Sequence, residues 1–474
     1  MKDGVEVDEQ VDVEEQTGSG DELLKTEEVP KQDPIASAID KLVLRISDIA
    51  FSAITFIPKA ARWQIDQLKK TSKEIQRNFE VYEGGDDSIK AAALKNIIVL
   101  DKNYKRFEKS EIVRTLEIGH FLSLFSAFDA FTGDILTSIY NKKPALFKGI
   151  NRSMTVSEML QYENIEDVKS IILQNEIENF RRKSYVEQFE SLENRFSINL
   201  KKFPKWAEFI ECSQRRNLLT HCDGIVSDQY ILVCKKEGCK IDPPVNPGEK
   251  LGLSPRYLIS SCNLIIEVAL KLGQTLWRDQ FEDEIKLADE HLHSTQYEFL
   301  RREQYDLAIM AGDFSYNLPK HSAETLKTIS LINYAIALKF KEQKEKTDKL
   351  LDSKDWGPLC NDFKLAVAVL KDDFAQAAIL MRKIGFVGEF VSEQGYHEWP
   401  LFKYFRESSE FLEAYNDIYG HQFIKELKRA TDEARAESEE EIAKIQKDLI
   451  EEHEVHCDEG GLAVSSGNSI SNSA

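Results

Sequence analysis

Several familiar sequence signals are absent from this chain of 474 residues. A transmembrane helix needs about 20 mostly apolar residues, but the apolar stretch at 49–57 is short and charged residues interrupt the region before it. The first 30 residues are acidic, whereas a secretory signal peptide begins with basic residues. The seven cysteines are odd in number and lack a disulfide-like spacing, which suits a reducing compartment. We therefore expect a cytoplasmic protein without a transmembrane segment.

The signature motifs of several enzyme classes are also missing. The sequence contains no Walker-type glycine-rich loop, no G-x-S-x-G elbow and no H-E-x-x-H pair. Cys234 and Cys239 raise the question of zinc, because His221 and Cys222 are nearby in the sequence. Structural zinc sites usually combine two ligand pairs, each with about two to four residues between its ligands, and no well-spaced second pair is present. The sequence therefore predicts neither a metal site nor a cofactor.

The net charge of −20 at first argues against a nucleic-acid partner. Its distribution changes that conclusion, because residues 1–34 and 431–474 each contain 12 acidic and 3 basic residues. The acidity thus belongs to the two ends, and the body of the chain is close to neutral. An apolar content of 42% with 30% charged residues fits a globular protein with a large core.

The candidate functional residues lie in 215–221, R-R-N-L-L-T-H, within a helix expected after Pro204. Asn217 and His221 are four residues apart and share one helix face. Arg216 is five residues from His221, about 140° around a helix, but its long side chain can lean toward the same surface. A cation, an amide and a group that titrates near neutral pH can converge on a phosphate. By spacing alone, the favoured interpretation is a surface arginine and a histidine near the end of a bundle helix.

The six residues from Arg216 to His221 resemble the R-N-x-x-x-H signature of the HEPN superfamily, the helical domains of many RNase toxins and defence proteins. Residues 223–226 follow directly, as in several HEPN branches, and residues 121–131 are similar to the first core helix of those domains. The resemblance covers roughly residues 108–290. It implies a metal-independent endoribonuclease, a toxin or anti-phage defence effector, that works as a homodimer in which two motifs meet.

The resemblance also assigns roles to the motif residues. His221 would be the general acid/base that acts on the RNA 2′-hydroxyl and the leaving oxygen, and Arg216 would stabilise the charge that develops on the phosphate. Asn217 would hydrogen-bond the phosphate or orient the histidine. The product would carry a 2′,3′-cyclic phosphate. Separately from the resemblance, the proximity of the helices suggests that either Asp129 or Asp134, on the first long helix, could pair with Arg216 across the bundle.

Basic residues gather around the motif in sequence and could guide an RNA backbone. The alternative is an ordinary solvated surface. The candidate RNA-binding residues are Lys201, Lys202, Lys205, Arg215, Lys235 and Lys236.

The fold class that the patterns predict is mainly α, with five regions along the chain. A disordered acidic arm at 1–34 precedes a helical N-terminal extension at 35–107. A central HEPN-like helical bundle with a small β-ribbon follows at 108–295. An α-hairpin, tetratricopeptide-like region at 296–420 resembles a solenoid, and a charged helix with a disordered tail ends the chain at 421–474.

Three finer expectations concern individual segments. The amphipathic segment 35–77 should be broken at Pro58; packing on the body or on a second subunit is favoured over a membrane-surface helix. Residues 229–234 have strand-like composition and should form the ribbon, with a turn at 236–239. Phenylalanines in 121–131 recur at helical spacing and should form core.

The C-terminal region contains two related segments, in which Ala335 and Ala366 are 31 residues apart. Small residues at such positions let helices approach closely, as in helical-hairpin repeats that offer a groove to a protein partner. A purely structural helical extension is the alternative. For the whole chain, the second functional interpretation is a non-catalytic HEPN-like dimerisation or nucleotide-binding module that acts as a protein-interaction scaffold.

Overall fold

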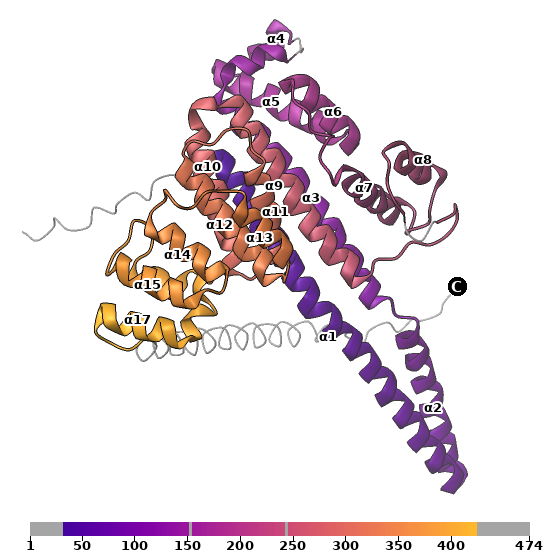
Figure 1. The fold of residues 1–474 in the computed structure, drawn as a ribbon. Helices are drawn as coiled ribbons and strands as arrows, with labels where there is room; N and C mark the ends of the chain where they lie inside the picture. The colour runs from indigo at the N-terminus through magenta and orange to yellow at the C-terminus, as the bar shows by residue number, and fades with distance from the viewer. Residues whose placement is uncertain (1–31, 151–153, 242–244, 424–474) are drawn as a thin grey trace, which may run out of the picture. The chain divides into compact units, whose positions relative to one another are not determined.

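The computed structural model describes residues 32–150, 154–241 and 245–423 (Figure 1). Within these ranges the chain forms seventeen α-helices and no β-sheet, which confirms the mainly α fold class. No described helix has the length and apolar content that a membrane span requires. The chain divides into two compact units, residues 1–269 and 270–474. The expectations for 1–31 and 424–474 lie outside the described residues.

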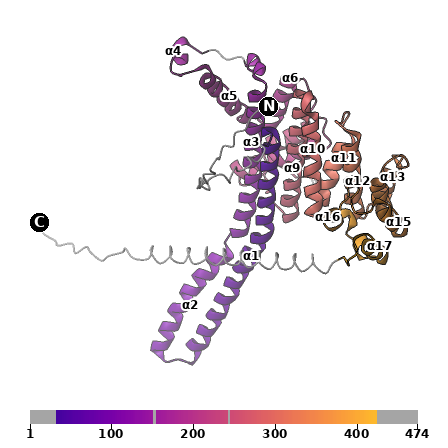
Figure 2. The ribbon, with the colours of Figure 1, turned by 90° about the vertical axis from the view of Figure 1, so that its left-hand side faces the viewer.

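The first unit begins with a long helical hairpin, α1 (Pro34–Gly84) and α2 (Asp87–Glu108) (Figure 2). The Asp33 side chain accepts from the Ile35 backbone N–H at 2.8 Å, and Pro34 occupies the first turn, where its missing N–H costs nothing. The helix continues through Pro58, so the predicted break is wrong. Tertiary packing on both sides of the proline, with Ile57 buried before it and Thr71 buried after it, holds the helix despite one lost hydrogen bond.

The N-terminal half of α1 packs on α3 (Ile112–Lys142), and its C-terminal half packs along α2. Ile35, Ile39, Leu42 and Ile46 recur at helical spacing and are buried in this contact. Helix α1 therefore packs on the body, as the favoured interpretation of segment 35–77 expects.

Helix α3 is the centre of the first unit. Its Phe121, Phe125, Phe128 and Phe131 are buried, which confirms that these residues form core. The rest of the unit consists of η1 (Pro144–Gly149), α4 (Val156–Met159), α5 (Ile165–Arg181), α6 (Tyr185–Phe196), α7 (Trp206–His221), α8 (Asp228–Lys236) and the part of α9 (Pro255–Gln280) before residue 270.

The predicted β-ribbon is wrong, because residues 228–236 form helix α8. The Ser227 side chain caps this helix by accepting from the Tyr230 backbone N–H at 3.2 Å. Tyr230 and Cys234, four residues apart, are both buried on one helix face, which is a helical period. The strand-like composition was overridden by this cap and by burial of one face. An isolated antiparallel bridge joins Ile225 to Lys250.

The second unit is built from three consecutive helical hairpins. The first pairs α10 (Ile285–Arg301) with α11 (Tyr305–Tyr316), the second α12 (Glu324–Phe340) with α13 (Lys344–Asp352), and the third α14 (Asn361–Leu370) with α15 (Phe374–Ile384). Shorter elements flank them: η2 (Glu282–Glu284), α16 (Glu393–Glu398), η3 (Pro400–Phe402), η4 (Phe405–Glu407) and α17 (Ser409–Tyr419).

The three hairpins turn in the same way. Glu303, Glu342 and Asp372 adopt left-handed φ values of 56°, 58° and 60°. In each turn the next residue donates its backbone N–H to the carbonyl five residues earlier, at 2.8–2.9 Å, which satisfies a carbonyl at the helix end. The first two turn residues are 39 positions apart, and the last two are 30 positions apart. Ala335 and Ala366 are 31 positions apart, so their spacing differs by one residue from that of the last two turns.

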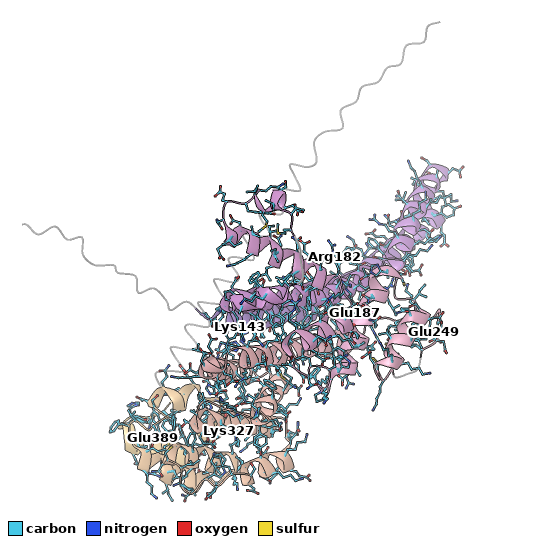
Figure 3. The ribbon with its side chains drawn as sticks, turned by 90° about the horizontal axis from the view of Figure 1, so that it is seen from above. Lys143, Arg182, Glu187, Glu249, Lys327 and Glu389 are labelled. Atoms are coloured by element: carbon cyan, nitrogen blue, oxygen red, sulfur yellow. The ribbon has the colours of Figure 1, made fainter. Side chains whose placement is uncertain are left out.

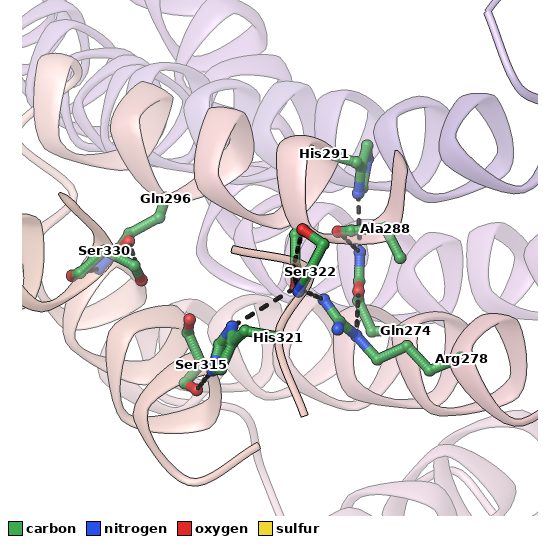
Figure 4. Close-up of polar contacts among 10 residues, drawn as sticks. Gln274, Arg278, Ala288, His291, Gln296, Ser315, His321, Ser322 and Ser330 are labelled. Atoms are coloured by element: carbon green, nitrogen blue, oxygen red, sulfur yellow. Dashed lines mark hydrogen bonds and ion pairs between the residues drawn. The ribbon is translucent and has the colours of Figure 1, made fainter. Parts of the chain in front are cut away.

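A buried polar network links α10 to the segment before α12 (Figure 4). The Asp289 carboxylate, 3% exposed, lies 2.7 Å from Arg278 Nη2 and accepts from the backbone N–H and hydroxyl of Ser322 at 2.6 and 2.7 Å. Burial raises the pKa of Asp289, but hydrogen bonds from His321, Ser322 and Arg278 outweigh burial and hold that pKa below its usual range. Nearby, Gln296 and Ser330 join α10 to α12 through two further hydrogen bonds.

We expect Asp289→Asn to lower the free energy of unfolding by about 3–5 kcal/mol at pH 7, because it leaves the Arg278 charge buried without a partner. A depressed native pKa contributes stability above the ordinary pKa of about 3.9 and loses it as the pH falls. The difference between wild type and variant should therefore shrink below about pH 4 in urea denaturation. The control is Asp306→Asn, which removes an exposed ion pair with Lys341 and should cost about 0–1 kcal/mol. Equal losses in both variants would contradict the structural role of Asp289.

The hairpin turns lead to a second prediction. A non-glycine residue in the left-handed region carries a steric cost that glycine avoids. Glu342→Gly should therefore raise the free energy of unfolding by about 0.5–1 kcal/mol, whereas Glu345→Gly, in the first turn of α13, should lower it by up to about 1 kcal/mol. Thermal unfolding of the two variants beside the wild type measures both. A destabilised Glu342→Gly would show that this turn is not under strain.

Candidate functional site

The motif occupies the last turns of α7, which is anchored at both ends. At its start, Trp206 is buried and its indole N–H donates to Glu237 Oε2 at 2.9 Å. At its end, Gly224 has φ 81° and donates its N–H to the Leu218 carbonyl at 3.0 Å. A Cβ at Gly224 would come within 2.6 Å of the Leu251 carbonyl oxygen. Glycine is therefore required where the chain turns away from the motif.

The loop between α8 and α9 closes over this turn. The Val226 N–H donates to the Glu249 carbonyl at 2.8 Å, and the Leu251 N–H donates to the Gly224 carbonyl at 2.8 Å. The Glu249 side chain (Figure 3) accepts from the backbone N–H and the side-chain amide of Asn246, which lowers the pKa of Glu249. The end of α7 is thus held by backbone hydrogen bonds rather than by a strand.

The three motif residues differ in environment. Arg216 and Asn217 are half-buried, and His221, the last residue of α7, is exposed. Arg216 Nη1 donates to Asn217 Oδ1 at 3.1 Å, so these two side chains are in contact. His221 lies a helical turn and a half further along, at the open end of the helix. None of the three is buried in the apolar interior.

Of the two carboxylates expected near Arg216, Asp129 is the one close to it. Burial raises the pKa of Asp129, while a 2.7 Å hydrogen bond from the Tyr185 hydroxyl and the charges of Arg216 and Arg181 act in the opposite direction. Asp134 instead pairs with Lys41 at 2.9 Å. The guanidinium of Arg216 therefore lies on the side of α7 that faces α3 and α6.

A charged cluster lies beside the exposed end of α7. Asp223, two residues after His221, accepts from Arg114 at the start of α3 and from Lys250 at 2.8 Å. These two cations lower the pKa of Asp223. Arg114 also pairs with Glu111 at 3.1 Å, so this cluster of two bases and two acids is close to neutral.

The predicted RNA-binding lysines fall into two groups. Lys201 pairs with Glu190 at 2.9 Å, and Lys205 pairs with Glu267 at 3.2 Å, so their charges are largely compensated within the first unit. Lys202, Lys235 and Lys236 are exposed, the latter two in the last turn of α8.

Arg215, the sixth predicted RNA-binding residue, belongs to a buried cluster that the sequence did not reveal. Its side chain is 13% exposed and lies 2.8 Å from the Glu211 carboxylate, with its guanidinium 4.1 Å from the centre of the Tyr257 ring. The hydroxyls of Tyr230 and Tyr257 donate to the same carboxylate at 2.7 and 2.6 Å. The spacing of Glu211 and Arg215, four residues on one helix, was a visible signal, whereas the two tyrosines come from other helices.

Two cavities border this cluster. One of about 520 Å³ is lined by residues that include Glu211, Cys212, Lys240 and Tyr257, and one of about 490 Å³ includes Arg215. Burial raises the pKa of the Cys212 thiol to about 12, so this cysteine is a poor nucleophile at neutral pH. A third cavity, about 590 Å³, lies between α3 and α5. None of these three cavities is lined by Arg216, Asn217 or His221.

Across 32–150, 154–241 and 245–423, no group of three or more histidine, cysteine, aspartate or glutamate residues is placed to hold a metal ion. Cys234 is buried, whereas Cys222 is exposed, and the Cys239 thiol donates to the Ala207 carbonyl at 3.1 Å.

The Arg215 cluster gives a prediction that separates structure from RNA binding. Arg215→Ala removes the cation that compensates a buried carboxylate, so we expect a loss of about 3–5 kcal/mol in the free energy of unfolding. Lys236→Ala changes an exposed residue and should stay within about 0.5 kcal/mol of wild type. Urea denaturation followed by circular dichroism measures both. An Arg215→Ala variant of unchanged stability that binds RNA less tightly would show that Arg215 serves RNA instead.

Comparison of the chain with protein-family models, with curated proteins and with solved structures found no match. The resemblance of residues 216–221 to the HEPN signature therefore stands on the residues themselves and on their setting at the end of α7.

Proposed function

We propose that this protein is a metal-independent endoribonuclease of the HEPN type, which cleaves RNA by histidine and arginine chemistry. The observation that carries the proposal is the exposure of His221 at the end of α7, with the Arg216–Asn217 pair half-buried on the same helix. A scissile phosphate can reach such a helix end without any rearrangement of the core.

The proposed reaction is an internal transfer at phosphorus. A neutral imidazole removes the proton from the 2′-hydroxyl, the 2′-oxygen attacks the adjacent phosphorus, and the bond from phosphorus to the 5′-oxygen breaks. The leaving 5′-oxygen takes a proton, and the other product ends in a 2′,3′-cyclic phosphate. Arg216 stabilises the negative charge that builds on the phosphate oxygens, and Asn217 holds the guanidinium through their hydrogen bond.

A homodimer through the HEPN-like domain supplies the two histidines that this scheme uses, one as base and one as acid. The exposed Lys202, Lys235 and Lys236 provide cations for the RNA backbone. Lys201 and Lys205 contribute less, because acidic residues already compensate them.

The second unit fits a tetratricopeptide-like array that binds a controlling protein partner. Its three hairpins share one turn geometry. The helices also approach closely: a Cβ on Gly312 of α11 would lie 2.6 Å from Tyr334 Cβ on α12. Such control suits a toxin or anti-phage defence effector in the cytoplasm, where the six described cysteines, all free thiols, would stay reduced.

A second candidate is a non-catalytic HEPN-like module that serves in dimerisation or nucleotide binding, as a scaffold for protein interactions. One observation favours it. Arg216 already has local partners, since it donates to Asn217 and faces the Asp129 carboxylate. Those contacts give the arginine a structural role that needs no RNA.

The decisive experiment is cleavage of RNA by the purified protein in EDTA, with detection of 2′,3′-cyclic phosphate ends. We expect the wild type to cut and His221→Ala and Arg216→Ala each to lose about 100-fold or more in rate, because general acid–base catalysis contributes a factor of that order. The control is His421→Ala, which alters an exposed histidine of the second unit and should cut like the wild type.

Two results would contradict the proposal. Cutting that is unchanged in His221→Ala would remove the histidine from the mechanism. A wild type that cuts none of a panel of structured and single-stranded RNAs, while it still binds nucleotides or a protein partner, would favour the scaffold.

A further inference from the structure

The hairpin of α1 and α2 leaves apolar side chains exposed that its own fold does not cover. Two antiparallel helices bury a single seam, here marked by Thr71, Ala93 and Ile97. We call residues 59–109 the arm. Its exposed large apolar residues are Trp63, Ile65, Phe79, Val81, Tyr82, Ile89, Leu94, Ile98 and Val99. Single exposed apolar residues are normal on a surface, but this many on one helical hairpin indicate a surface made for contact.

Charge on the arm is separated along its length. The tip, residues 78–89, has four acidic residues and no basic one. The shaft on either side, residues 59–77 and 90–109, has twelve basic and four acidic residues. Two arms laid side by side in parallel would place tip on tip and shaft on shaft. Laid antiparallel, each acidic tip meets the basic shaft of the other arm.

We propose that the arm pairs antiparallel with the arm of a second copy of this chain, forming a four-helix bundle. Such a contact uses the same patch on both copies, as two-fold symmetry requires. Helix pairs that cross at about 20° give the side-by-side packing of four-helix bundles. The proposal goes beyond the ribonuclease and does not rest on it, because the arm contains none of the motif residues.

One face of α1 carries both the apolar and the charged elements. At 3.6 residues per turn, Ile65, Lys69, Phe79, Glu80 and Glu83 fall within a sector of about 100°, and all five are exposed. This sector lies beside the seam with α2 rather than in it. In an antiparallel pair, Lys69 of one arm meets Glu80 of the other when the two-fold axis passes close to residues 74–75.

The root of the arm adjoins the candidate site. Arg114, five residues beyond the arm, donates to Asp223, which follows His221 by two residues. An antiparallel pair therefore brings the acidic tip of one copy toward the root of the other, on the side of the first unit where α7 ends.

Paired charge reversals test the interface. In analytical ultracentrifugation of the full chain, the wild type should self-associate through the arm, as a dimer or, where the HEPN-like contact of the proposed function also forms, as a larger assembly. Glu80→Lys with Glu83→Lys, and separately Lys69→Glu with Lys73→Glu, should each weaken dimerisation at least about tenfold through like-charge repulsion. An equimolar mixture of the two double variants should restore the dimer, since each mutated tip then faces a mutated shaft. Restoration also shows that both variants fold.

The matched control is Lys344→Glu with Lys346→Glu, two exposed residues of α13 in the second unit, which should dimerise like the wild type. A wild type that stays monomeric over the accessible concentrations would overturn the proposal. So would self-association that both arm variants leave unchanged, since its interface would lie elsewhere, or a mixture that associates no better than its components. Loss of the dimer with full restoration would establish the arm as the interface even if the protein cleaves no RNA.

Discussion

The first unit depends on the burial of one helix face, the aromatic side of α3. Phe125 and Phe128 contact Tyr185 of α6, and Phe128 also lies 5.4 Å, ring to ring, from Phe209 of α7. Aromatic side chains bury large areas and dominate the energetics of such cores. Because the buried Phe209 ring packs against α3, this contact fixes the axis and the rotation of α7. The position of the motif, about two to three turns further along α7, is thus a consequence of core packing that has no direct part in chemistry.

Rotation of α7 then decides which of two neighbouring arginines is available. Successive residues on a helix point about 100° apart, so Arg215 and Arg216 cannot share an environment. Arg215 turns toward the Glu211 carboxylate and the Tyr257 ring, where its charge is buried and compensated. Arg216 turns toward α3 and α6 and remains half-buried. A buried carboxylate such as Glu211 requires a fixed cation, and that requirement removes Arg215 from any RNA surface while it leaves Arg216 accessible.

Much of the fold could be predicted from the sequence because helical periodicity is a local signal. The mainly α class, the aromatic core of α3 and the packing of α1 on the body all follow from apolar residues at three- and four-residue spacing. Prediction failed where tertiary contacts outweigh local preference: the helix passes through Pro58, and α8 forms from residues of strand-like composition. Within the site, the contact between Arg216 and Asn217 is local. The partners of Arg215 lie on helices far apart in sequence, so no spacing rule could reveal them.

Helix α1 is longer than its packing against α3 requires. A helix rises 1.5 Å per residue, so the 51 residues of α1 extend well past its contact with α3. Beyond that contact α2 alone packs along it, and a two-helix seam buries too little apolar surface to cover Ile65 and Phe79. The same segment separates its charges by sign along its length, which a solvated surface does not require. The exposed apolar residues require a partner surface to cover them, and the separation of charge favours a partner that lies antiparallel. The two observations are independent, yet both are met by an antiparallel copy of the same hairpin.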